Sequence, residues 1–377
     1  MLMAKPLCEY YGKCGGCNLQ HLETEIQLKQ KAELIRHVIN FEDIQVFSGE
    51  GYGYRNRQDF FFRRNGIGLR EKGHASEILV VDKCPIAQPE VNKILMELNL
   101  HFKDNDNYSL RSGQGTFISA IVRAAAEGNG VCFVLNDNSP RLKEAVEKIE
   151  EYARGSQAGN IAVFYVDPNN KDFREPNDEN FFVAKGNEYL AQNYLGRKFC
   201  YPIEGFFQNN HQMAEQMQKY CNEKLAAYGT SMTSKAALLD LYGGVGTFGI
   251  INSSLFRKVT IIDFSSRSIA CAEKNIEENA VKNAKAIAMD LRSLKKLTVS
   301  GPLFAITDPP RSGMDIRALD SLNELKPEAI IYISCNPLQL GKELPRLKNY
   351  SVKSAAMFDM FPQTNHAEAI VELGLKN

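Results

Sequence analysis

One cysteine follows directly on an apolar run near the C-terminal end of the chain. The run covers residues 329–333, and Ser-Cys-Asn-Pro stands after it at 334–337. A run of this kind bounded by a turn predicts a buried strand that ends in a loop. A thiol in that loop is placed for nucleophilic chemistry, although most free cysteines are only small buried hydrophobes. The residues near Cys335 must decide between these two roles.

His366 and Glu368 follow the turn between the last two candidate strands of the chain. Each of them alone is an ordinary turn or strand residue. Beside Cys335, at neighbouring strand ends, they would place a base next to a nucleophile. A thiol and a base are the pair needed to methylate an unreactive ring carbon.

The elements that must position these groups are apolar runs separated in places by helical patterns, near 266–279 and 315–325. The runs are 236–242, 259–263, 286–289, 303–307 and 329–334. Buried strands that alternate with helices predict an α/β fold with a parallel, doubly wound sheet. Two further runs, 351–358 and 366–373, are too close together for an intervening helix. We expect them to form an antiparallel hairpin that closes the edge of the sheet.

The chain divides by composition into three segments. Residues 1–47 hold several cysteines and a helix. Residues 48–199 are punctuated by Gly, Asn and Pro between short alternating strands, which predicts a β-rich α+β domain. Residues 200–377 carry the doubly wound domain. The short strands of the middle segment include 58–63, 116–122 and 130–135.

Composition excludes several classes of protein. The 377 residues include 45 basic and 45 acidic side chains, so any nucleic-acid site must be a local basic patch. No uncharged apolar run reaches the length of a membrane span, and the N-terminus lacks the apolar core of a signal peptide. We therefore expect a soluble, cytoplasmic protein with no membrane partner, and a monomer. Nine cysteines in such a chain favour metal binding or catalysis over disulfides.

A glycine-rich segment follows the first predicted strand of the doubly wound domain, at residues 240–249. Its glycines allow a sharp turn close to a ligand, and Asp263 stands where an acid would hold a ribose. The pattern is Gly-Gly-x-Gly, whereas dinucleotide sites use Gly-x-Gly-x-x-Gly. Asp308-Pro309-Pro310 ends the fourth strand and resembles the substrate-side motif of class I methyltransferases that act on nucleic acid. Together these features favour S-adenosylmethionine over a dinucleotide.

The motifs together resemble those of the uracil-5 RNA methyltransferases, over nearly the whole chain. The matching segments are 205–209, 240–249, 308–313, 334–337 and 358–368. The resemblance implies a class I (Rossmann-like) S-adenosylmethionine domain joined to a β-rich α+β RNA-binding domain that contains an iron–sulfur cluster. The acid ending the second strand is often Glu in this family, and the shorter Asp263 can still accept ribose hydroxyl hydrogen bonds.

The resemblance also implies roles for individual residues. Cys335 would add to carbon 6 of uracil, and Glu368 would later remove the proton from carbon 5. It further implies RNA contacts from Phe207 and Arg311. The implied cofactor contacts are Gln208, Tyr242, Gly244, Asp263 and Asp308.

Four N-terminal cysteines form a candidate metal site: Cys8, Cys14, Cys17 and Cys84. Their spacing allows either tetrahedral zinc or a [4Fe-4S] cluster. The Cys-Gly-Gly-Cys with a distant Cys-Pro resembles the iron–sulfur members of the same family, so we expect [4Fe-4S]. Methyl transfer moves no electron, and the cluster would therefore serve structure or RNA positioning.

A basic and aromatic segment at residues 54–64 is the candidate RNA surface. Arginines interleaved with aromatic residues suit phosphate contact and base stacking, and we assign RNA contact to Arg55 and Arg57. The alternative is that the phenylalanines form a buried strand face. A uridine in structured RNA must also be flipped out of its stack to react.

The identity of the RNA stays open between two candidates. The chain starts almost at the cysteines, and family members without an additional N-terminal β-barrel resemble enzymes of 23S ribosomal RNA. Similar archaeal chains act on transfer RNA. We expect 23S ribosomal RNA, with a transfer RNA T-loop uridine as the alternative. A redox enzyme and a non-catalytic RNA-binding protein are remoter alternatives: radical enzymes usually use three close cysteines, and Cys335 and Glu368 are both present.

Overall fold

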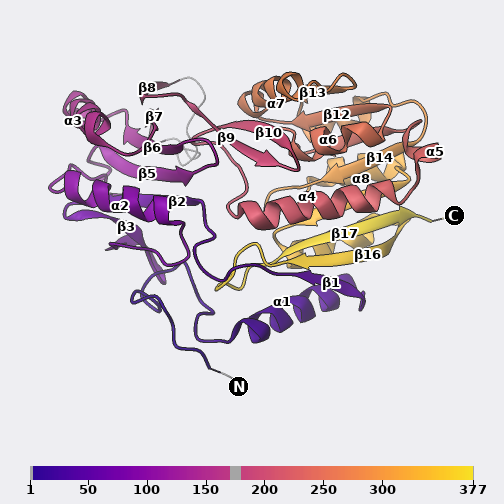
Figure 1. The fold of residues 1–377 in the computed structure, drawn as a ribbon, viewed down its shortest axis with the longest axis horizontal. Helices are drawn as coiled ribbons and strands as arrows, with labels where there is room; N and C mark the ends of the chain where they lie inside the picture. Colours follow the sequence, from indigo (N-terminus) through magenta and orange to yellow (C-terminus); the bar gives the residue numbers. More distant parts are fainter. Residues whose placement is uncertain (1–2, 170–179, 377) are drawn as a thin grey trace. The chain divides into compact units, whose positions relative to one another are not determined.

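The computed structural model describes residues 3–169 and 180–376 (Figure 1). Residues 170–179 of the expected middle domain lie outside the described part. The chain forms two compact units, each built from segments that are separate in the sequence. Unit 1 comprises residues 1–23, 50–192 and 201–209, and unit 2 comprises residues 24–49, 193–200 and 210–377. The expected divisions near residues 47 and 199 differ from these units, because residues 24–49 and 193–200 belong to unit 2, whereas residues 201–209 belong to unit 1.

Unit 1 is built on a seven-stranded sheet with the order β4-β3-β2-β5-β6-β7-β8. The pairs are antiparallel except β6 and β7, which are parallel and joined through a helix. The middle segment is therefore β-rich α+β, as its composition predicts. The strands are β2 (Arg57–Arg63), β3 (Gly66–Glu71), β4 (His74–Val80), β5 (Phe117–Ala124), β6 (Asn129–Asn136), β7 (Asn160–Val166) and β8 (Phe181–Lys185).

Helices α2 (Pro89–His101) and α3 (Leu142–Gly155) bury their apolar faces in the core of unit 1. Alternate residues of β2 point into the same core, so that Phe60 and Phe62 are buried. Phe61 points the other way, and the Arg70 guanidinium lies 4.2 Å from its ring centre. The buried-face alternative thus holds for two of the three phenylalanines.

Unit 2 contains an eight-stranded sheet with the order β1-β16-β17-β15-β14-β11-β12-β13. The five strands from β15 to β13 are mutually parallel, as expected for a doubly wound sheet. The strand order reverses between β11 and β14, which is where such sheets bind ligands. The strands are β1 (Ile44–Phe47), β11 (Ala237–Leu241), β12 (Lys258–Asp263), β13 (Ala284–Ala288), β14 (Leu303–Thr307), β15 (Ala329–Ser334), β16 (Tyr350–Phe358) and β17 (Glu368–Leu375).

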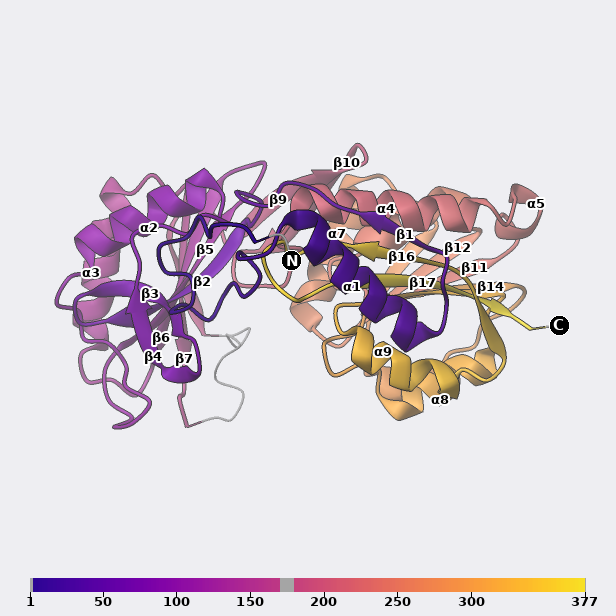
Figure 2. The same cartoon turned by 90° about the horizontal axis from the view of Figure 1, so that it is seen from below.

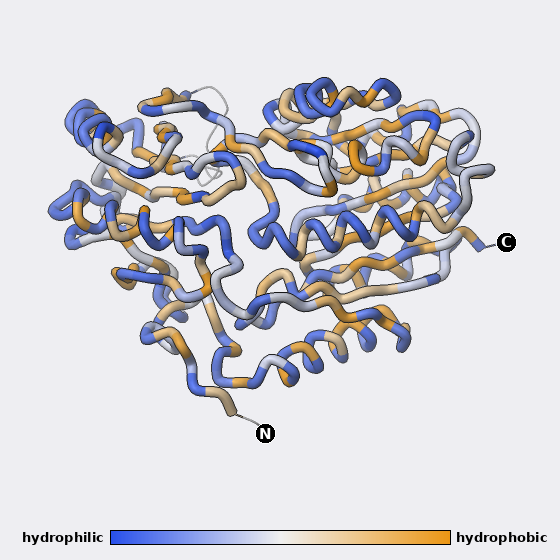
Figure 3. Tube along the Cα trace, in the orientation of Figure 1, coloured by the Kyte–Doolittle hydropathy of each residue, from blue (hydrophilic) through white to orange (hydrophobic). Residues whose placement is uncertain are grey.

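Helices cover both faces of this sheet. Figure 2 shows α4 and α7 on one side, with α1, α8 and α9 on the other. Apolar residues follow the strands between them, while the helices are mixed in hydropathy (Figure 3), as expected when one helix face is buried. The α-helices are α1 (Thr24–Ile39), α4 (His211–Ala226), α5 (Thr230–Thr233), α6 (Thr247–Asn252), α7 (Ser266–Glu278), α8 (Ile316–Leu325) and α9 (Pro337–Glu343).

Shorter elements complete the chain. Among the described residues, no helix is long and apolar enough to cross a membrane. Two strands, β9 (Tyr189–Tyr194) and β10 (Arg197–Pro202), form a separate two-stranded sheet whose residues are divided between the two units. Three 3₁₀ turns lie at Ser253–Leu255, Leu291–Lys296 and Leu344–Arg346.

The expected hairpin exists as β16 and β17, but the prediction that it closes the sheet edge is wrong. Strand β1 pairs in parallel with β16 and lies outside it. Ile44 of β1 lies opposite Ala355 of β16. This pairing joins the first fifty residues of the chain to the last thirty. A four-residue strand with a 300-residue separation from its partner has no local sequence signal, so α1 and β1 could not be assigned to this unit beforehand.

Candidate active site

The sheet register brings Cys335 and Glu368 together. Strand β15 pairs with β17 so that Ser334 lies opposite Ala369. Moving one position along each antiparallel strand places Cys335 opposite Glu368. Glu368 begins β17 and is buried, whereas His366 is exposed before the strand. The acid, not the imidazole, is therefore the group beside the thiol.

The turn after β15 presents the thiol at the carboxyl end of the sheet. Ser334 Oγ donates to the Asn336 carbonyl and accepts from the Asn336 amide, at 3.1 and 3.2 Å. Asn336 caps α9, which starts with Pro337 at a position where proline costs nothing. The Asn336 side-chain amide also donates to the Arg311 carbonyl at 2.9 Å. The motif around Cys335 thus ties its loop to the Asp-Pro-Pro loop.

Asp308 reaches the same end of the sheet on the neighbouring strand. Strand β14 lies between β11 and β15, with Thr307 opposite both Leu241 and Tyr332. The Asp308 amide continues the ladder by donating to the Leu241 carbonyl at 3.3 Å. Asp308 therefore follows the strand that lies between those leading to the glycine loop and the thiol loop.

The charges around Cys335 oppose one another. Burial, followed by the carboxyl groups of Glu368 and Asp308, raises the pKa of the Cys335 thiol to about 11. The Arg311 guanidinium acts in the other direction, by its charge and by a hydrogen bond. Arg311 is exposed yet directed at the thiol, so the site gives this arginine a task besides the RNA contact predicted for it.

The two acids beside the thiol favour their protonated forms. Burial raises the pKa of Asp308 to about 7. Burial, with the nearby Asp308, raises the pKa of Glu368 well above its usual value, and Arg311 opposes this shift. Carboxyl groups with raised pKa values beside a nucleophile are typical of sites that transfer protons.

The glycine loop after β11 is hydrogen-bonded to Asp263, the last residue of the neighbouring strand β12. The Gly244 amide donates to Asp263 Oδ2 at 2.9 Å, and the Ser265 amide donates to Oδ1 at 2.9 Å. Gly244 has a φ of +53°, which glycine adopts without strain. The preceding Tyr242 also has a positive φ, of +56°, and is partly buried. Asp263 is thus held at the loop, where the sequence predicts a ribose partner.

Asp240 supports the loop from below and was not predicted as a site residue. Its side chain is buried, and its Oδ2 accepts a hydrogen bond from the Gly249 amide at 2.7 Å. A Cβ on Gly249 would lie 2.7 Å from Ile261 Cγ1 and 3.0 Å from Asp240 Oδ2. Burial raises the pKa of Asp240 to about 7, although the Gly249 amide opposes this. The glycine is needed for close packing rather than for an unusual φ.

Gln208 belongs to unit 1 and lies in the segment 203–209. Asn56 holds this segment, because its Nδ2 donates to the Gln208 carbonyl at 3.0 Å and its amide donates to the Asn209 carbonyl at 2.9 Å. The fully buried Arg123 donates to the carbonyls of Ile203, at 2.9 Å, and Gly205. Arg123 had no distinguishing neighbour in the sequence, so its role could not be predicted.

The residues of unit 1 that were predicted to contact RNA differ in exposure and in the groups that they contact. Arg57 donates to Asp59 at 2.7 Å and to the Gly205 carbonyl at 3.1 Å, so it takes part in holding the same segment. Phe207 is buried and stacks on Tyr201 with ring centres 4.0 Å apart. The exposed ring of the motif is Phe206, with 70% of its surface accessible. Sequence alone could not tell which of two adjacent phenylalanines faces outward.

The four N-terminal cysteines border one cavity of about 230 Å³ in unit 1. Arg55 and Gln20 also line it. Burial, followed by the negative charge of Cys17, raises the pKa of Cys84 to about 12. Among the described residues, however, no three His, Cys, Asp or Glu side chains are gathered closely enough to hold a single metal ion. The four cysteines are Cys8, Cys14, Cys17 and Cys84.

Comparisons with known proteins identify the family of the chain. The pattern of the family described as tRNA (Uracil-5-)-methyltransferase matches residues 183–376. The chain belongs to this family. It is 31% identical, over 96% of its length and 83% of the relative's, to an uncharacterized RNA methyltransferase of Caldanaerobacter subterraneus. The uracil-5 methyltransferase family thus accounts for the ordered motifs, and the protein is a methyltransferase.

Archaeal members of the family have names that specify a substrate. The tRNA (uracil(54)-C(5))-methyltransferase of Pyrococcus abyssi is 28% identical over 99% of this chain and 86% of its own. The crystal structure of that P. abyssi enzyme in complex with S-adenosyl-L-homocysteine superposes with a TM-score of 0.77, at 26% identity, over 96% of this chain and 86% of the other. The fold is therefore shared along nearly the whole chain.

Proposed function

We propose that this methyltransferase transfers the methyl group of S-adenosylmethionine to carbon 5 of a uridine in RNA. The observation that carries the proposal is the register that sets Cys335 opposite Glu368, one strand from Asp308. The glycine loop with Gly244 and Asp263 would hold the cofactor, with Tyr242 as a further contact. When bound, the cofactor supplies an electrophilic methyl group on a positively charged sulfur.

The reaction proceeds in three balanced steps. The Cys335 thiolate forms a bond to carbon 6, and the electrons of the 5,6 double bond move into an enolate on the ring. Carbon 5 then takes the methyl group, and the methyl–sulfur bond breaks to leave S-adenosylhomocysteine. The Glu368 carboxylate removes the proton on carbon 5; the double bond re-forms, and the carbon–sulfur bond to Cys335 breaks.

The surroundings of Cys335 support this assignment. Only a thiolate attacks, and the pKa of about 11 keeps the thiol protonated in the free enzyme. Arg311 stabilises the thiolate, and a positively charged methyl donor would act in the same direction. We infer that cofactor binding prepares both Cys335 and Glu368 by favouring their ionised forms.

RNA containing 5-fluorouridine tests the chemistry. With fluorine in place of hydrogen, carbon 5 carries no proton for the base to remove. The bond to Cys335 should therefore persist, and the protein–RNA complex should survive a denaturing gel. Cys335→Ala should abolish the complex, whereas Cys271→Ala, a buried cysteine on α7, should retain it. If neither transfer RNA nor ribosomal RNA forms a covalent complex, the mechanism is refuted.

The RNA substrate is proposed from the relatives. Their names specify uridine 54 of transfer RNA for the archaeal enzymes, which favours the transfer RNA alternative over 23S ribosomal RNA. Either target requires the base to be flipped from its stack. Mapping 5-methyluridine in both RNAs from a deletion strain would decide: loss only from the T-loop supports transfer RNA, and loss only from 23S RNA rejects it.

We further propose that the four cysteines of unit 1 hold a [4Fe-4S] cluster. Its support is the complete set of four thiols around one cavity. Burial raises the pKa of Cys17, and a hydrogen bond from the Gln20 side chain opposes this; beyond this contact the buried Gln20 Nε2 has no hydrogen-bond partner among the described residues. A cluster spreads its ligands around four irons, in contrast to a single zinc ion, and this suits thiols that border a cavity.

Metal analysis tests the cluster without depending on activity. Anaerobically purified protein should be brown, with about four irons per chain. Cys84→Ser should lose most of the iron, while Cys132→Ser, a buried cysteine in the same unit, should keep it. A colourless protein with one zinc per chain would reject the cluster.

A further inference from the structure

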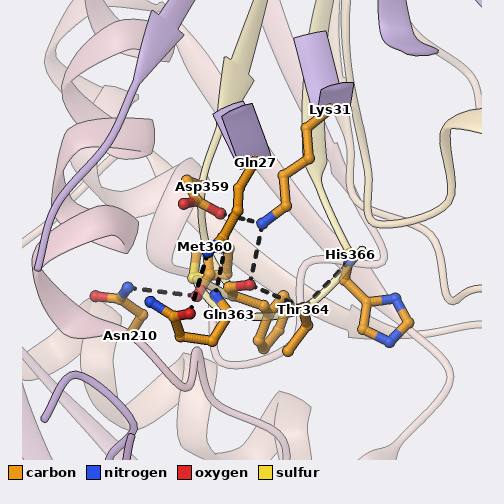
Figure 4. A network of polar contacts seen from close by, with 9 residues as sticks. Gln27, Lys31, Asn210, Asp359, Met360, Gln363, Thr364 and His366 are labelled. Atoms are coloured by element: carbon orange, nitrogen blue, oxygen red, sulfur yellow. Dashed lines mark hydrogen bonds and ion pairs between the residues drawn. The ribbon is translucent and has the colours of Figure 1, made fainter. Parts of the chain in front are cut away.

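Helix α1 contacts the loop that leads into the proposed base. The loop consists of residues 359–367 and connects β16 to β17, so it ends directly before Glu368. Figure 4 shows Gln27 and Lys31 of α1 directed at this loop. The two residues are four positions apart and therefore lie on one face of the helix. Both are buried, with exposures of 2% and 3%.

Gln27 forms a reciprocal pair with Gln363. Its Nε2 donates to Gln363 Oε1 at 3.1 Å, and its Oε1 accepts from the Gln363 amide at 3.1 Å. Gln363 has a φ of +68°, an uncommon conformation for a residue with a side chain. The two hydrogen bonds therefore fix a backbone position that the loop would not adopt by itself.

Lys31 holds the beginning of the same loop. Its Nζ donates to Asp359 Oδ1 at 2.5 Å and to the Phe361 carbonyl at 3.2 Å. Asp359 is 2% exposed, so both charges of this pair are removed from water. Such a pair contributes little net stability compared with apolar residues, but it is strict in geometry. The Lys31–Asp359 pair is therefore explained better by its positioning of the loop than by a gain in folding stability.

The loop transmits this placement to Glu368. The Asn210 side chain donates to the Met360 carbonyl at 3.3 Å, and Thr364 Oγ1 donates to the Phe361 carbonyl at 2.8 Å. The His366 amide then donates to Thr364 Oγ1 at 3.2 Å, two residues before Glu368. Hydrogen bonds thus follow the loop from α1 to His366, two residues before β17 begins.

We propose that Gln27 and Lys31 are positioning residues for the base Glu368. The inference rests on the proposed function, because it assumes that Glu368 removes the carbon 5 proton. Proton removal follows adduct formation, and it depends on the angle and distance of the Glu368 carboxylate. Cys335 belongs to another loop, and the hydrogen bonds of Gln27 and Lys31 go to the 359–367 loop, so replacing these two side chains should slow resolution of the adduct far more than its formation.

Single-turnover kinetics separate these two steps. Enzyme in excess is mixed with S-adenosylmethionine and a labelled transcript, either a transfer RNA or a 23S fragment, whichever it methylates. Denaturing gels follow adduct formation, and release of 5-methyluridine RNA follows resolution. For Gln27→Ala and Lys31→Met we expect formation within about threefold of wild type and resolution slowed at least about tenfold, which corresponds to about 1.4 kcal/mol. The exposed Lys29→Met on the same helix should change neither step.

A purely structural role would give a different result. When folded enzyme saturates the RNA, first-order rate constants do not depend on how much enzyme is folded, so a variant that is only destabilised keeps unchanged rates, and its amplitude falls once folded enzyme is scarcer than RNA. If Lys31→Met folds poorly, the double variant Lys31→Met with Asp359→Leu removes both buried charges. Loss of amplitude alone, or an equal slowing of both steps, overturns the inference. If Glu368→Gln resolves its adduct at the wild-type rate, the proposed base itself is wrong.

Discussion

Replacement of Arg311 by glutamine tests the electrostatic account of the nucleophile. Arg311 is the group that stabilises the Cys335 thiolate, against burial and the carboxyl groups of Glu368 and Asp308. With a pKa of about 11, only about a thousandth of the thiol is ionised at pH 8. A thiol with the ordinary value of 9.0 would be about one-tenth ionised. The thiolate fraction of Cys335 should therefore be about a hundred times smaller than that of an ordinary thiol.

The size of the Arg311 effect follows from its exposure. A hydrogen bond to a charged group contributes about 1.5–3 kcal/mol, but the exposed guanidinium is screened by water, which reduces this to about 1 kcal/mol. Arg311→Gln should then raise the pKa of Cys335 further and lower the thiolate fraction about fivefold at any pH below 10.

Alkylation by iodoacetamide measures this directly. The rate at Cys335 is followed by mass spectrometry of its peptide between pH 7 and 10, in protein without cofactor. Wild type should gain about tenfold per pH unit without a plateau, because thiolate increases until the pKa is reached. Arg311→Gln should run parallel and about fivefold lower, while Arg317→Gln on α8 should match wild type. A plateau below pH 9, or equal rates for Arg311→Gln and wild type, would refute the reasoning.

Three further expectations concern the scaffold. Gly249→Ala forces a Cβ against Ile261 and Asp240 and should lower the free energy of unfolding in urea by about 1–3 kcal/mol. Gly155→Ala places its Cβ where no atom lies within 4 Å and should leave this free energy unchanged. Equal losses for the two variants would contradict the packing argument. The buried acids Asp240 and Asp308 bind protons more tightly in the folded state, with pKa values of about 7, so stability without cofactor should fall as pH rises from about 4 to 7 and level off above that. A urea midpoint that is higher at pH 8 than at pH 5.5 would reverse the sign. Phe207→Ala should destabilise unit 1 by about 3–5 kcal/mol. Phe206→Ala should leave the stability unchanged and weaken RNA binding in a filter-binding assay, by about 1–3 kcal/mol if the ring stacks on a base.

Periodicity and loop chemistry predicted the doubly wound core. The apolar runs that end at Asp263, Thr307 and Ser334 are strands, because their residues are buried on both faces and no helical stripe competes. The thiol and its acid were also predictable as candidates, since Cys335 follows one apolar run and Glu368 lies at the start of another. That Cys335 lies opposite Glu368 was not, because register depends on pairing that no single strand contains.

Residues that act through long-range burial escaped prediction. Lys31 reads as one of several charged residues on a polar helix, yet it is enclosed because Asp359 meets it from the other end of the chain. Arg123 likewise stands in an apolar strand, and its backbone acceptors lie 80 residues away. Side chains of this kind acquire their roles from topology, which a single sequence does not display.

The discontinuity of unit 2 has a consequence for how the protein is made. Helix α1 and strand β1 leave the ribosome early, but the partners of Lys31 and Ile44 are among the last residues to be synthesised. The 328 positions between Lys31 and Asp359 take roughly 15 to 65 s to translate at 5–20 residues per second. During that time the apolar face of α1 and the buried lysine have no native partner. Helix α1 therefore reaches these partners only after the whole of unit 1 has emerged, and unit 1 can fold ahead of it.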